Sequence, residues 1–171
     1  MDSPSQSILL ARHGPIAVSW HLRVPGRSLA GFAAQVQRSG IVTDSAPDPT
    51  VRHQAQMAGI LVCSDLRRSL DSARAVAPER AAMPNRLFRE AELPTSFGTS
   101  LALRASTWAM LMRAFWFGRI CSGSESVAAF RQRARQATDL LEELAAASAS
   151  VFLMGHGFLN LQIARELRRR G

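Results

Sequence analysis

The sequence has 171 residues, of which 47% are hydrophobic and 20% are charged. These values predict one folded domain over residues 1–171 and exclude a largely disordered chain. All 21 basic residues are arginine, and the net charge of +8 suits an anionic partner: a phosphate ester, a nucleic acid or a membrane surface. The apolar runs are too short to span a bilayer and the first residues do not resemble a signal peptide, so we expect no membrane partner. Cys63 and Cys121 lack zinc-ligand spacing, which favours a reduced, cytoplasmic location and no metal.

Short apolar runs that end at polar loops predict buried strands over Ser7–Arg12, Ile60–Cys63 and Ser150–Met154, with a shorter strand over Arg86–Ala91. Segments with helical spacing of apolar residues alternate with these strands. The predicted helices cover Leu29–Arg38, Thr50–Gly59, a segment opened by an N-capping Ser64 with Asp65 in its first turn, Leu101–Phe117, a long helix from Ser124 or Ser126 to about Ala147, and Phe158–Arg170. Residues 15–28, 43–50 and 94–98 are predicted loops. The alternation predicts an α/β protein with three α/β/α layers around a mostly parallel sheet.

Three loops come directly after the predicted strands, and they carry the candidate site. They are Arg12-His13-Gly14, Ser64 to Arg68, and Gly155-His156-Gly157. Ligands of such sheets bind beyond the carboxyl ends of the strands, so we expect these loops to converge. Two histidines, one or two arginines and two helix N-termini together make an electropositive pocket suited to a tetrahedral dianion. A histidine with one neutral ring nitrogen can attack phosphorus.

Four segments, in order along nearly the whole chain, resemble one family. Arg12-His13-Gly14 matches an R-H-G signature, residues 63–73 are similar to S-x-L-x-R-A-x-x-T-A, residues 123–133 are similar to G-E-S-x-x-x-F-x-x-R, and residues 151–157 are similar to V-x-V-x-S-H-G. The sequence thereby resembles the histidine phosphatase superfamily, whose fold is phosphoglycerate mutase-like, and its small single-domain first branch in particular. The resemblance implies that fold, no cofactor, and a small anionic phosphate-ester substrate.

The resemblance also implies roles for individual residues. His13 would be the phosphorylated nucleophile, Arg12 and Arg68 would clamp phosphate oxygens, and His156 would hydrogen-bond the transferring phosphoryl group. Glu90 lies where many members carry the proton donor, which would need a raised pKa. The usual Gly-aromatic-Gly pattern after it is missing, so Glu92 is an alternative donor, and Glu90 could instead serve a helix dipole or Arg89.

Several residues carry two interpretations each. His21, Glu92 and Phe158 are candidate substrate contacts, whereas His53 is expected to be exposed or structural. Arg67 is expected to be solvated. The stripe from Trp108 to Trp116 is typical of a core but could line a lid. The sequence departs from the family pattern at Asp65, Ser69 and Ser72 in the second motif and at Gly155 in the fourth. Pro15 follows the R-H-G signature, where Glu or Gln is frequent in the family.

The predicted function is a phosphatase of the histidine acid phosphatase type, acting on a small phosphomonoester or a phosphoprotein through phospho-His13. One alternative is a phosphoglycerate mutase-like phosphoryl transferase, although residues 68–156 form a compact segment for a mutase. Another is an anion-binding protein of the same fold with weakened catalysis. Nucleic-acid binding through Arg168–Arg170 is not favoured, since that cluster lacks interleaved aromatics. A homodimer is compatible with the sequence but not required by it.

Overall fold

The computed structural model describes residues 6–43, 46–95, 97–120 and 125–171. The elements along the chain are β1 (Ser7–Arg12), β2 (Arg23–Pro25), α1 (Leu29–Arg38), α2 (Pro49–Met57), β3 (Ile60–Cys63), α3 (Arg67–Val76), β4 (Met83–Pro84), β5 (Ala102–Arg104), α4 (Ala105–Phe117), α5 (Val127–Ser148), β6 (Ser150–Gly155) and α6 (Gly157–Arg170). Short 3₁₀ turns lie at Gly26–Ser28 and Arg86–Phe88. Within the described ranges, no helix is both long and apolar enough to cross a membrane.

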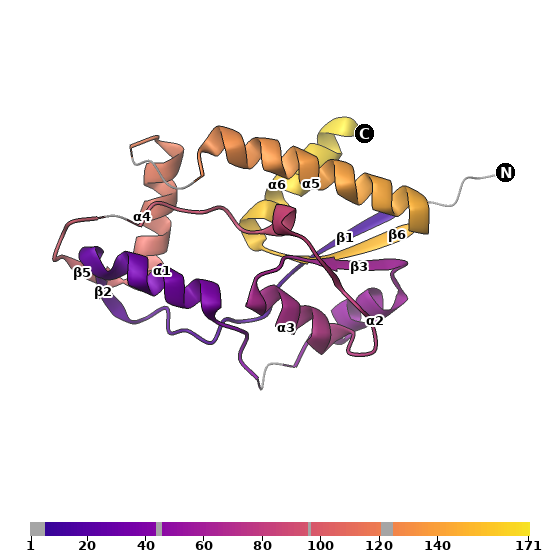
Figure 1. Ribbon diagram of the computed structural model, residues 1–171, viewed down its shortest axis with the longest axis horizontal. Coiled ribbons are helices and arrows are strands. Elements are labelled where there is room, and N and C mark those ends of the chain that lie inside the picture. Colours follow the sequence, from indigo (N-terminus) through magenta and orange to yellow (C-terminus); the bar gives the residue numbers. More distant parts are fainter. Residues whose placement is uncertain (1–5, 44–45, 96, 121–124) are drawn as a thin grey trace.

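The main sheet has the order β1-β6-β3-β4, and every pair in it is parallel. Helices α5 and α6 cover one face and α2 and α3 cover the other (Figure 1). The predicted three-layer α/β fold is therefore confirmed. Arg12 pairs with Gly155 and Cys63 pairs with Met154, so three strands end at the same edge of the sheet. Parallel order thus delivers three loops to one place.

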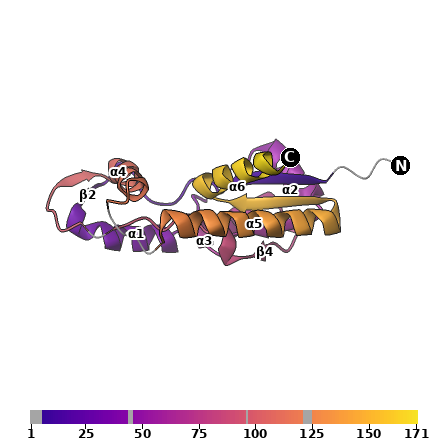
Figure 2. The ribbon, with the colours of Figure 1, turned by 90° about the horizontal axis from the view of Figure 1, so that it is seen from above.

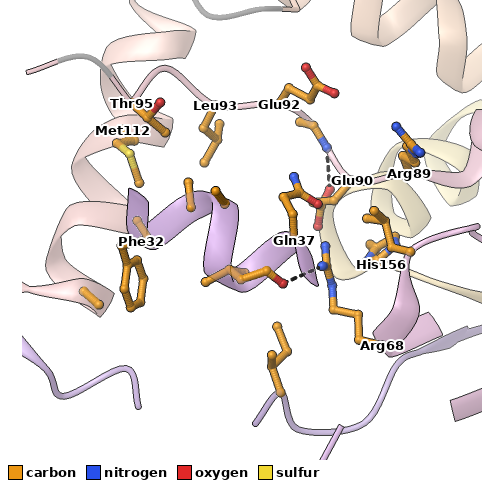
Figure 3. Close-up of a pocket in the computed structure, with 18 of the residues that line it drawn as sticks. Phe32, Gln37, Arg68, Arg89, Glu90, Glu92, Leu93, Thr95, Met112 and His156 are labelled. Atoms are coloured by element: carbon orange, nitrogen blue, oxygen red, sulfur yellow. Dashed lines mark hydrogen bonds between the residues drawn. The ribbon is translucent and has the colours of Figure 1, made fainter. Parts of the chain in front are cut away.

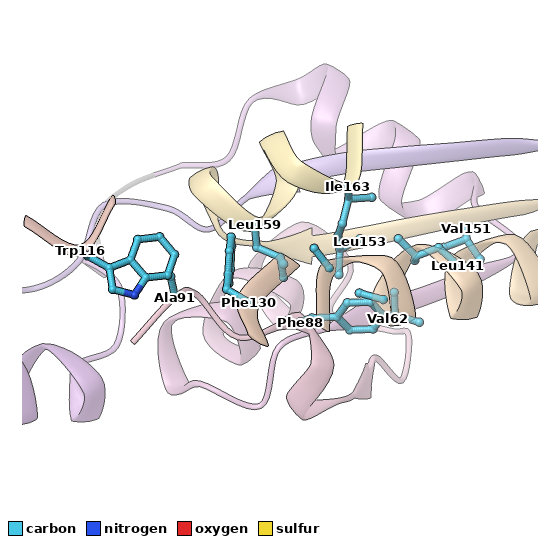
Figure 4. Packing of buried hydrophobic residues seen from close by; sticks show 12 residues of the cluster. Val62, Phe88, Ala91, Trp116, Phe130, Leu141, Val151, Leu153, Leu159 and Ile163 are labelled. Carbon is cyan, nitrogen blue, oxygen red and sulfur yellow. The ribbon is translucent and has the colours of Figure 1, made fainter. Parts of the chain in front are cut away.

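Strand β6 lies between β1 and β3 and is apolar on both faces. Val151 and Leu153 pack with residues of α5 and α6, whereas Phe152 and Met154 pack with residues of α2 and α3. This alternation is expected from the two-residue period of a strand. The larger cluster, drawn in Figure 4, extends from Val151 at one end to Trp116 at the other. A central strand buried on both faces fixes the position of the residue after it, which here is His156.

A second, smaller group of elements lies beyond the carboxyl ends of the main strands (Figures 1 and 2). Strands β2 and β5 pair antiparallel, with Val24 opposite Leu103, and they carry α1 and α4 beside them. The indole Nε1 of Trp108 donates to the carbonyl of Val24 at 2.7 Å. Residues 15–28 are predicted as a loop and Leu101–Phe117 as one helix, so the sequence misses β2 in the first segment and β5 in the second. Each strand has three residues, and its partner lies about eighty residues away in the chain.

Two local predictions were wrong. Ser64 does not cap α3, which begins at Arg67; its hydroxyl accepts the N–H of Leu66 at 3.1 Å and its side chain is wholly buried. The segment Arg86–Ala91 is not a strand, since Asn85 accepts the N–H of Leu87 and turns the chain after β4. Ser126 does cap α5, accepting the N–H of Ala129 at 3.1 Å. The alternative start at Ser124, together with Cys121 and Gly123, lies outside the described residues.

Candidate active site

His13 comes directly after β1 and extends its pairing, because its backbone N–H donates to the carbonyl of Gly155 at 3.0 Å. Its ring Nδ1 lies 2.7 Å from the carbonyl oxygen of Gly14. A carbonyl only accepts hydrogen bonds, so Nδ1 must carry the proton. In the neutral ring the lone pair is then left on Nε2. The backbone of the loop thus selects the tautomer in which Nε2 can act as a nucleophile.

His156 comes directly after β6 and lies against His13. The two ring centroids are 4.9 Å apart, with an interplanar angle of 63°. His13 is 9% exposed and His156 is fully buried. Neither ring nitrogen of His156 has a hydrogen-bond partner among the described residues. The structure therefore brings together the two histidines from opposite ends of the chain. Both ring nitrogens of His156 can form hydrogen bonds with a bound ligand.

Burial keeps both imidazoles neutral. Desolvation, aided by the charges of Arg68 and Arg12, lowers the pKa of His13 to about 4. Desolvation and the same arginines, with His13 itself, lower the pKa of His156 to about 2. A cationic ring is poorly tolerated here because it would lose its water and face guanidinium groups. At neutral pH, His13 is therefore held in the form that has a free lone pair.

These shifted pKa values predict acid sensitivity. An unfolded histidine takes up a proton near its ordinary pKa of 6.5, but the folded site does not until the pH is much lower. Stability is thus fully present above that pKa and is lost as the pH falls. Between about pH 7 and pH 5 we expect the free energy of unfolding to drop by about 2 kcal/mol per histidine, or about 4 kcal/mol for the pair. Urea unfolding across this range measures it.

The matched comparison is the double variant His13→Asn, His156→Asn. Its free energy of unfolding should depend on pH much less steeply than that of the wild type, because neither site can bind an extra proton on unfolding. Equal slopes in the two proteins would contradict this origin of the acid sensitivity.

Arg68 lies in the first turn of α3 and is 4% exposed. One guanidinium nitrogen donates to the carbonyl of Val36 at 3.2 Å, and Nε has no partner in the described part of the chain. Burial lowers its pKa, and the charge of Glu90 opposes that shift. Arg67, in contrast, is exposed and lies 3.6 Å from Asp71, as expected for the solvated member of the pair. Of these two neighbours, Arg68 lines the cavity that also contains His13 and His156 (Figure 3).

Arg12 lies next to the first turn of α6. A Cβ built at Gly157 would be 3.4 Å from Cδ and 3.6 Å from Nε of Arg12, which is van der Waals contact, so the start of α6 packs directly beside this side chain. Gly155 is more restricted, because a Cβ there would collide with Oδ1 of Asn160. Asn160 in turn donates to the carbonyl of Ala11 at 2.9 Å, immediately before Arg12. The glycine that replaces the serine of the family pattern thus fits an asparagine that anchors the end of β1.

Serine hydroxyls tie α3 to the strand ends. The hydroxyl of Ser72 accepts the N–H of Gly14 at 2.9 Å and donates to the carbonyl of Arg68 at 2.7 Å. The hydroxyl of Ser69 donates to the carbonyl of Met154. Ser72 retains the hydroxyl of the threonine in the family pattern, and Ser69 supplies a hydroxyl where the pattern has alanine. These hydroxyls link α3 to the loop after β1 and to β6. Nothing in their spacing alone indicated these partners.

Glu90 has a structural role as well as a place in the cavity. Its two carboxyl oxygens accept the N–H groups of Phe158 and Leu159, both at 3.1 Å, at the start of α6. This is the helix-terminus interaction considered from the sequence, and it places the carboxyl group near His156. Glu90 also lines the cavity with Arg68, and Glu92 lines it from a more exposed position (Figure 3). Arg89 binds Asp65 instead, at 2.6 and 2.7 Å.

Arg133 of the third motif holds the segment that carries Glu90. Its guanidinium donates to the carbonyls of Leu87 at 2.9 Å and Arg89 at 2.6 Å. It also forms two 2.7 Å bonds with the carboxylate of Glu125. The third motif includes Glu125 and Arg133, but the sequence alone indicated no role for them. The structure assigns them to positioning the chain that leads into Glu90.

Two candidate contacts lie away from the cavity. His21 is exposed in a turn and is not one of the cavity-lining residues. Phe158 stacks on Phe130 with ring centroids 5.0 Å apart and also packs against Trp116 and Phe117. Trp116 and Trp108 are buried in the core clusters, in agreement with the core interpretation of that stripe. His53 is exposed on α2.

The basic C-terminal cluster is largely engaged in ion pairs. Arg169 contacts Glu166 at 2.5 Å, and Arg170 contacts Asp139 at 2.7 Å and Glu142 at 2.5 Å. Carboxylates thus already neutralise much of the charge that a nucleic acid would need to meet.

The three loops at the strand ends open into a cavity of about 560 Å³. Its polar end is formed by Arg12, His13, Arg68, Glu90 and His156. Its other walls come from α1, α4 and the segment after Glu90. Two arginines around a neutral histidine favour an anion whose oxygens can take forked hydrogen bonds. The arrangement can bind a phosphoryl group and attack it from Nε2 of His13.

Comparison with known proteins agrees with this geometry. A family model, that of the histidine phosphatase superfamily (branch 1), matches residues 49–170. The match includes Arg68 and His156 but begins after β1, so the placement of His13 rests on the sheet register. The comparison with curated proteins gave no match.

Solved structures share the fold. A mycobacterial glucosyl-3-phosphoglycerate phosphatase, solved with vanadate, is 18% identical with a TM-score of 0.58, over 96% of this chain and 82% of that one. A phosphoserine phosphatase from Entamoeba histolytica is 18% identical with a TM-score of 0.57, over 95% and 80%. The product of an open reading frame from Mycobacterium tuberculosis is 25% identical with a TM-score of 0.50, over 91% and 76%.

Proposed function

The chain belongs to branch 1 of the histidine phosphatase superfamily, and on that basis we propose that it hydrolyses a phosphomonoester through a phosphohistidine on His13. The observation that carries the proposal is the neutral imidazole of His13, with Nδ1 bound to Gly14 and its pKa lowered to about 4, beside the buried guanidinium of Arg68. This combination supplies a nucleophile and a cation where a phosphoryl group would lie.

In the proposed reaction, the Nε2 lone pair of His13 attacks phosphorus and the bond from phosphorus to the ester oxygen breaks. Arg12 and Arg68 bind the phosphoryl oxygens, and His156 donates a hydrogen bond to one of them. The carboxyl group of Glu90 gives its proton to the departing oxygen, which leaves as an alcohol. Water then attacks the phosphohistidine, the nitrogen–phosphorus bond breaks, and the carboxylate of Glu90 takes a proton from that water. The steps use these side chains and water.

The direct test is to trap the intermediate. Mixing the protein with a labelled phosphomonoester and quenching in alkali, where phosphohistidine survives, should give a labelled protein and release labelled phosphate. Labelled protein with isomerised substrate and no free phosphate would instead favour a phosphoryl transferase. Vanadate binding without labelling or turnover would favour an anion-binding protein.

Glu90 and Glu92 can be separated by the leaving group. Nitrophenolate departs readily without a proton, whereas an alkoxide does not, so loss of a proton donor is felt mainly with alkyl esters. We expect Glu90→Gln to lower kcat for an alkyl phosphate about 100-fold or more, and for p-nitrophenyl phosphate about tenfold or less. Glu92→Gln is the matched comparison and should show no such contrast.

Equal losses on both esters would assign Glu90 to holding α6 alone. A contrast found for Glu92→Gln rather than Glu90→Gln would transfer the donor role to Glu92.

A further inference from the structure

Beyond the phosphate-binding end, the cavity contains a chamber with mostly apolar walls. Six residues define it: Leu29, Phe32, Ala33 and Val36 from α1, and Ala109 and Met112 from α4. Ile16, Trp20 and Leu93 extend the same surface. In Figure 3, Phe32, Leu93 and Met112 lie on the side of the cavity away from Arg68 and His156. A phosphoryl group bound at the histidines would therefore direct its ester oxygen, and the alcohol attached to that oxygen, toward this chamber.

We propose that the physiological substrate is the phosphomonoester of a bulky, uncharged, largely apolar alcohol, and that the chamber between α1 and α4 binds the alcohol. This inference rests on the proposed phosphatase function and names its substrate class.

The size of the cavity supports an extended alcohol. Sites for organic ligands of moderate size measure roughly 300–1,000 Å³, and this cavity of about 560 Å³ falls in that range. Inorganic phosphate or a two-carbon ester would leave most of the apolar wall in contact with water. Each methylene group moved from water onto such a surface strengthens binding by about three- to fourfold.

The chemistry of the walls argues against a second charged group on the substrate. Among the described residues lining the part formed by α1 and α4, Arg113 carries charge, and it is exposed on α4. Gln37 of α1 and Thr95 also line the cavity, and Arg89 and Glu92 line it on the segment around Glu90. A carboxylate or ammonium group placed against Phe32 and Met112 would lose its hydration without a partner. A phosphorylated amino acid or phosphorylated hydroxy acid therefore fits this chamber poorly.

The experiment uses esters that differ in chain length but hardly in leaving-group chemistry. We expect kcat/KM to rise at least about 100-fold from ethyl to octyl phosphate, since several methylene groups become buried. Glycerol phosphate, phosphoserine and phosphoglycerate should all be poorer than octyl phosphate. A flat series, or a preference for one of these polar esters, would overturn the inference.

Variants locate the effect in the chamber. Ala109→Phe fills it from α4 and Ala33→Phe fills it from α1, and each should reduce the octyl-to-ethyl ratio of kcat/KM at least about tenfold. Ala114→Phe, on the same helix as Ala109 but exposed and outside the cavity lining, is the matched control and should retain the wild-type ratio. If the ratio is unchanged in both filling variants while thermal unfolding shows them folded, the alcohol does not lie between α1 and α4.

Alkyl phosphonates distinguish failure of this inference from failure of the proposed function, because they bind without being hydrolysed. Calorimetry should give tighter binding of octylphosphonate than of ethylphosphonate. That result with no turnover of any phosphate ester would support the chamber and overturn the hydrolase. Turnover of ethyl phosphate with no dependence on chain length would support the hydrolase and overturn the chamber.

Discussion

Substituting His13 with asparagine should lower kcat/KM for phosphate esters by about 10⁴-fold or more and abolish labelling of the protein by substrate. The side chain loses the Nε2 lone pair that would attack phosphorus. Asparagine is chosen because it is polar, is close in size and can still donate to the carbonyl of Gly14, the partner of Nδ1. Steady-state kinetics and alkaline quenching measure the two effects.

The control for this change is His53→Asn on α2, an exposed histidine that does not line the cavity, which should keep wild-type kinetics. Thermal unfolding should show both variants folded. Retention of more than about a tenth of the wild-type kcat/KM in folded His13→Asn would show that another group performs the attack.

Parallel strand order explains why His13, Arg68 and His156 lie in one cavity, because each comes shortly after a strand that ends at the same edge of the sheet, whereas Glu90 comes after a 3₁₀ turn. The apolar runs before His13 and before His156 indicate strands, and parallel order brings the ends of such strands to one edge without any further information. Strand order alone does not separate Arg67 from Arg68; the resemblance to the family motif indicated Arg68, and the structure buries Arg68 and exposes Arg67.

The apolar end of the cavity could not be predicted in this way. Its walls come from α1 and α4, which are held together by the pairing of Val24 with Leu103 and by the indole of Trp108. Strands of three residues are too short to show a period, and their partners lie far apart in the chain. The site therefore divides into a phosphate end set by local pattern and an alcohol end set by tertiary contacts.

The supporting contacts were equally hidden. Asp65 departs from the family pattern, and its partner Arg89 lies 24 residues away. Glu125 and Arg133 were recognised as a motif, but their targets are backbone carbonyls near Glu90, which carry no sequence signal. Such contacts depend on the path of the main chain, so they become visible only once that path is known.

The second large effect concerns Arg68, whose contributions to activity and to stability should have opposite signs. Arg68→Met removes a forked cation from the developing charge on the phosphoryl oxygens, and we expect kcat/KM to fall about 10³-fold. A buried guanidinium costs free energy when its partners are incomplete. Arg68 donates to Val36, which is only partly buried, and its Nε has no partner among the described residues.

Methionine fills similar space without that cost, and water can reach the carbonyl of Val36 in place of the lost donor. We therefore expect the free energy of unfolding at neutral pH to rise by about 1–2 kcal/mol in Arg68→Met. The pKa of His13 should also rise, because Arg68 helps to lower it. Urea unfolding and an NMR titration of labelled histidine check the two expectations.

Arg67→Met is the matched comparison, since it removes a neighbouring arginine that is exposed and pairs loosely with Asp71 at 3.6 Å. It should change the free energy of unfolding by less than about 0.5 kcal/mol and leave the kinetics as they are. Arg68→Lys restores the charge but not the fork, so it should recover part of the lost rate while staying well below the wild type. If Arg68→Met is instead destabilised, the guanidinium supports the fold more than its contacts indicate, and the trade-off between binding an anion and burying a cation does not operate at this position.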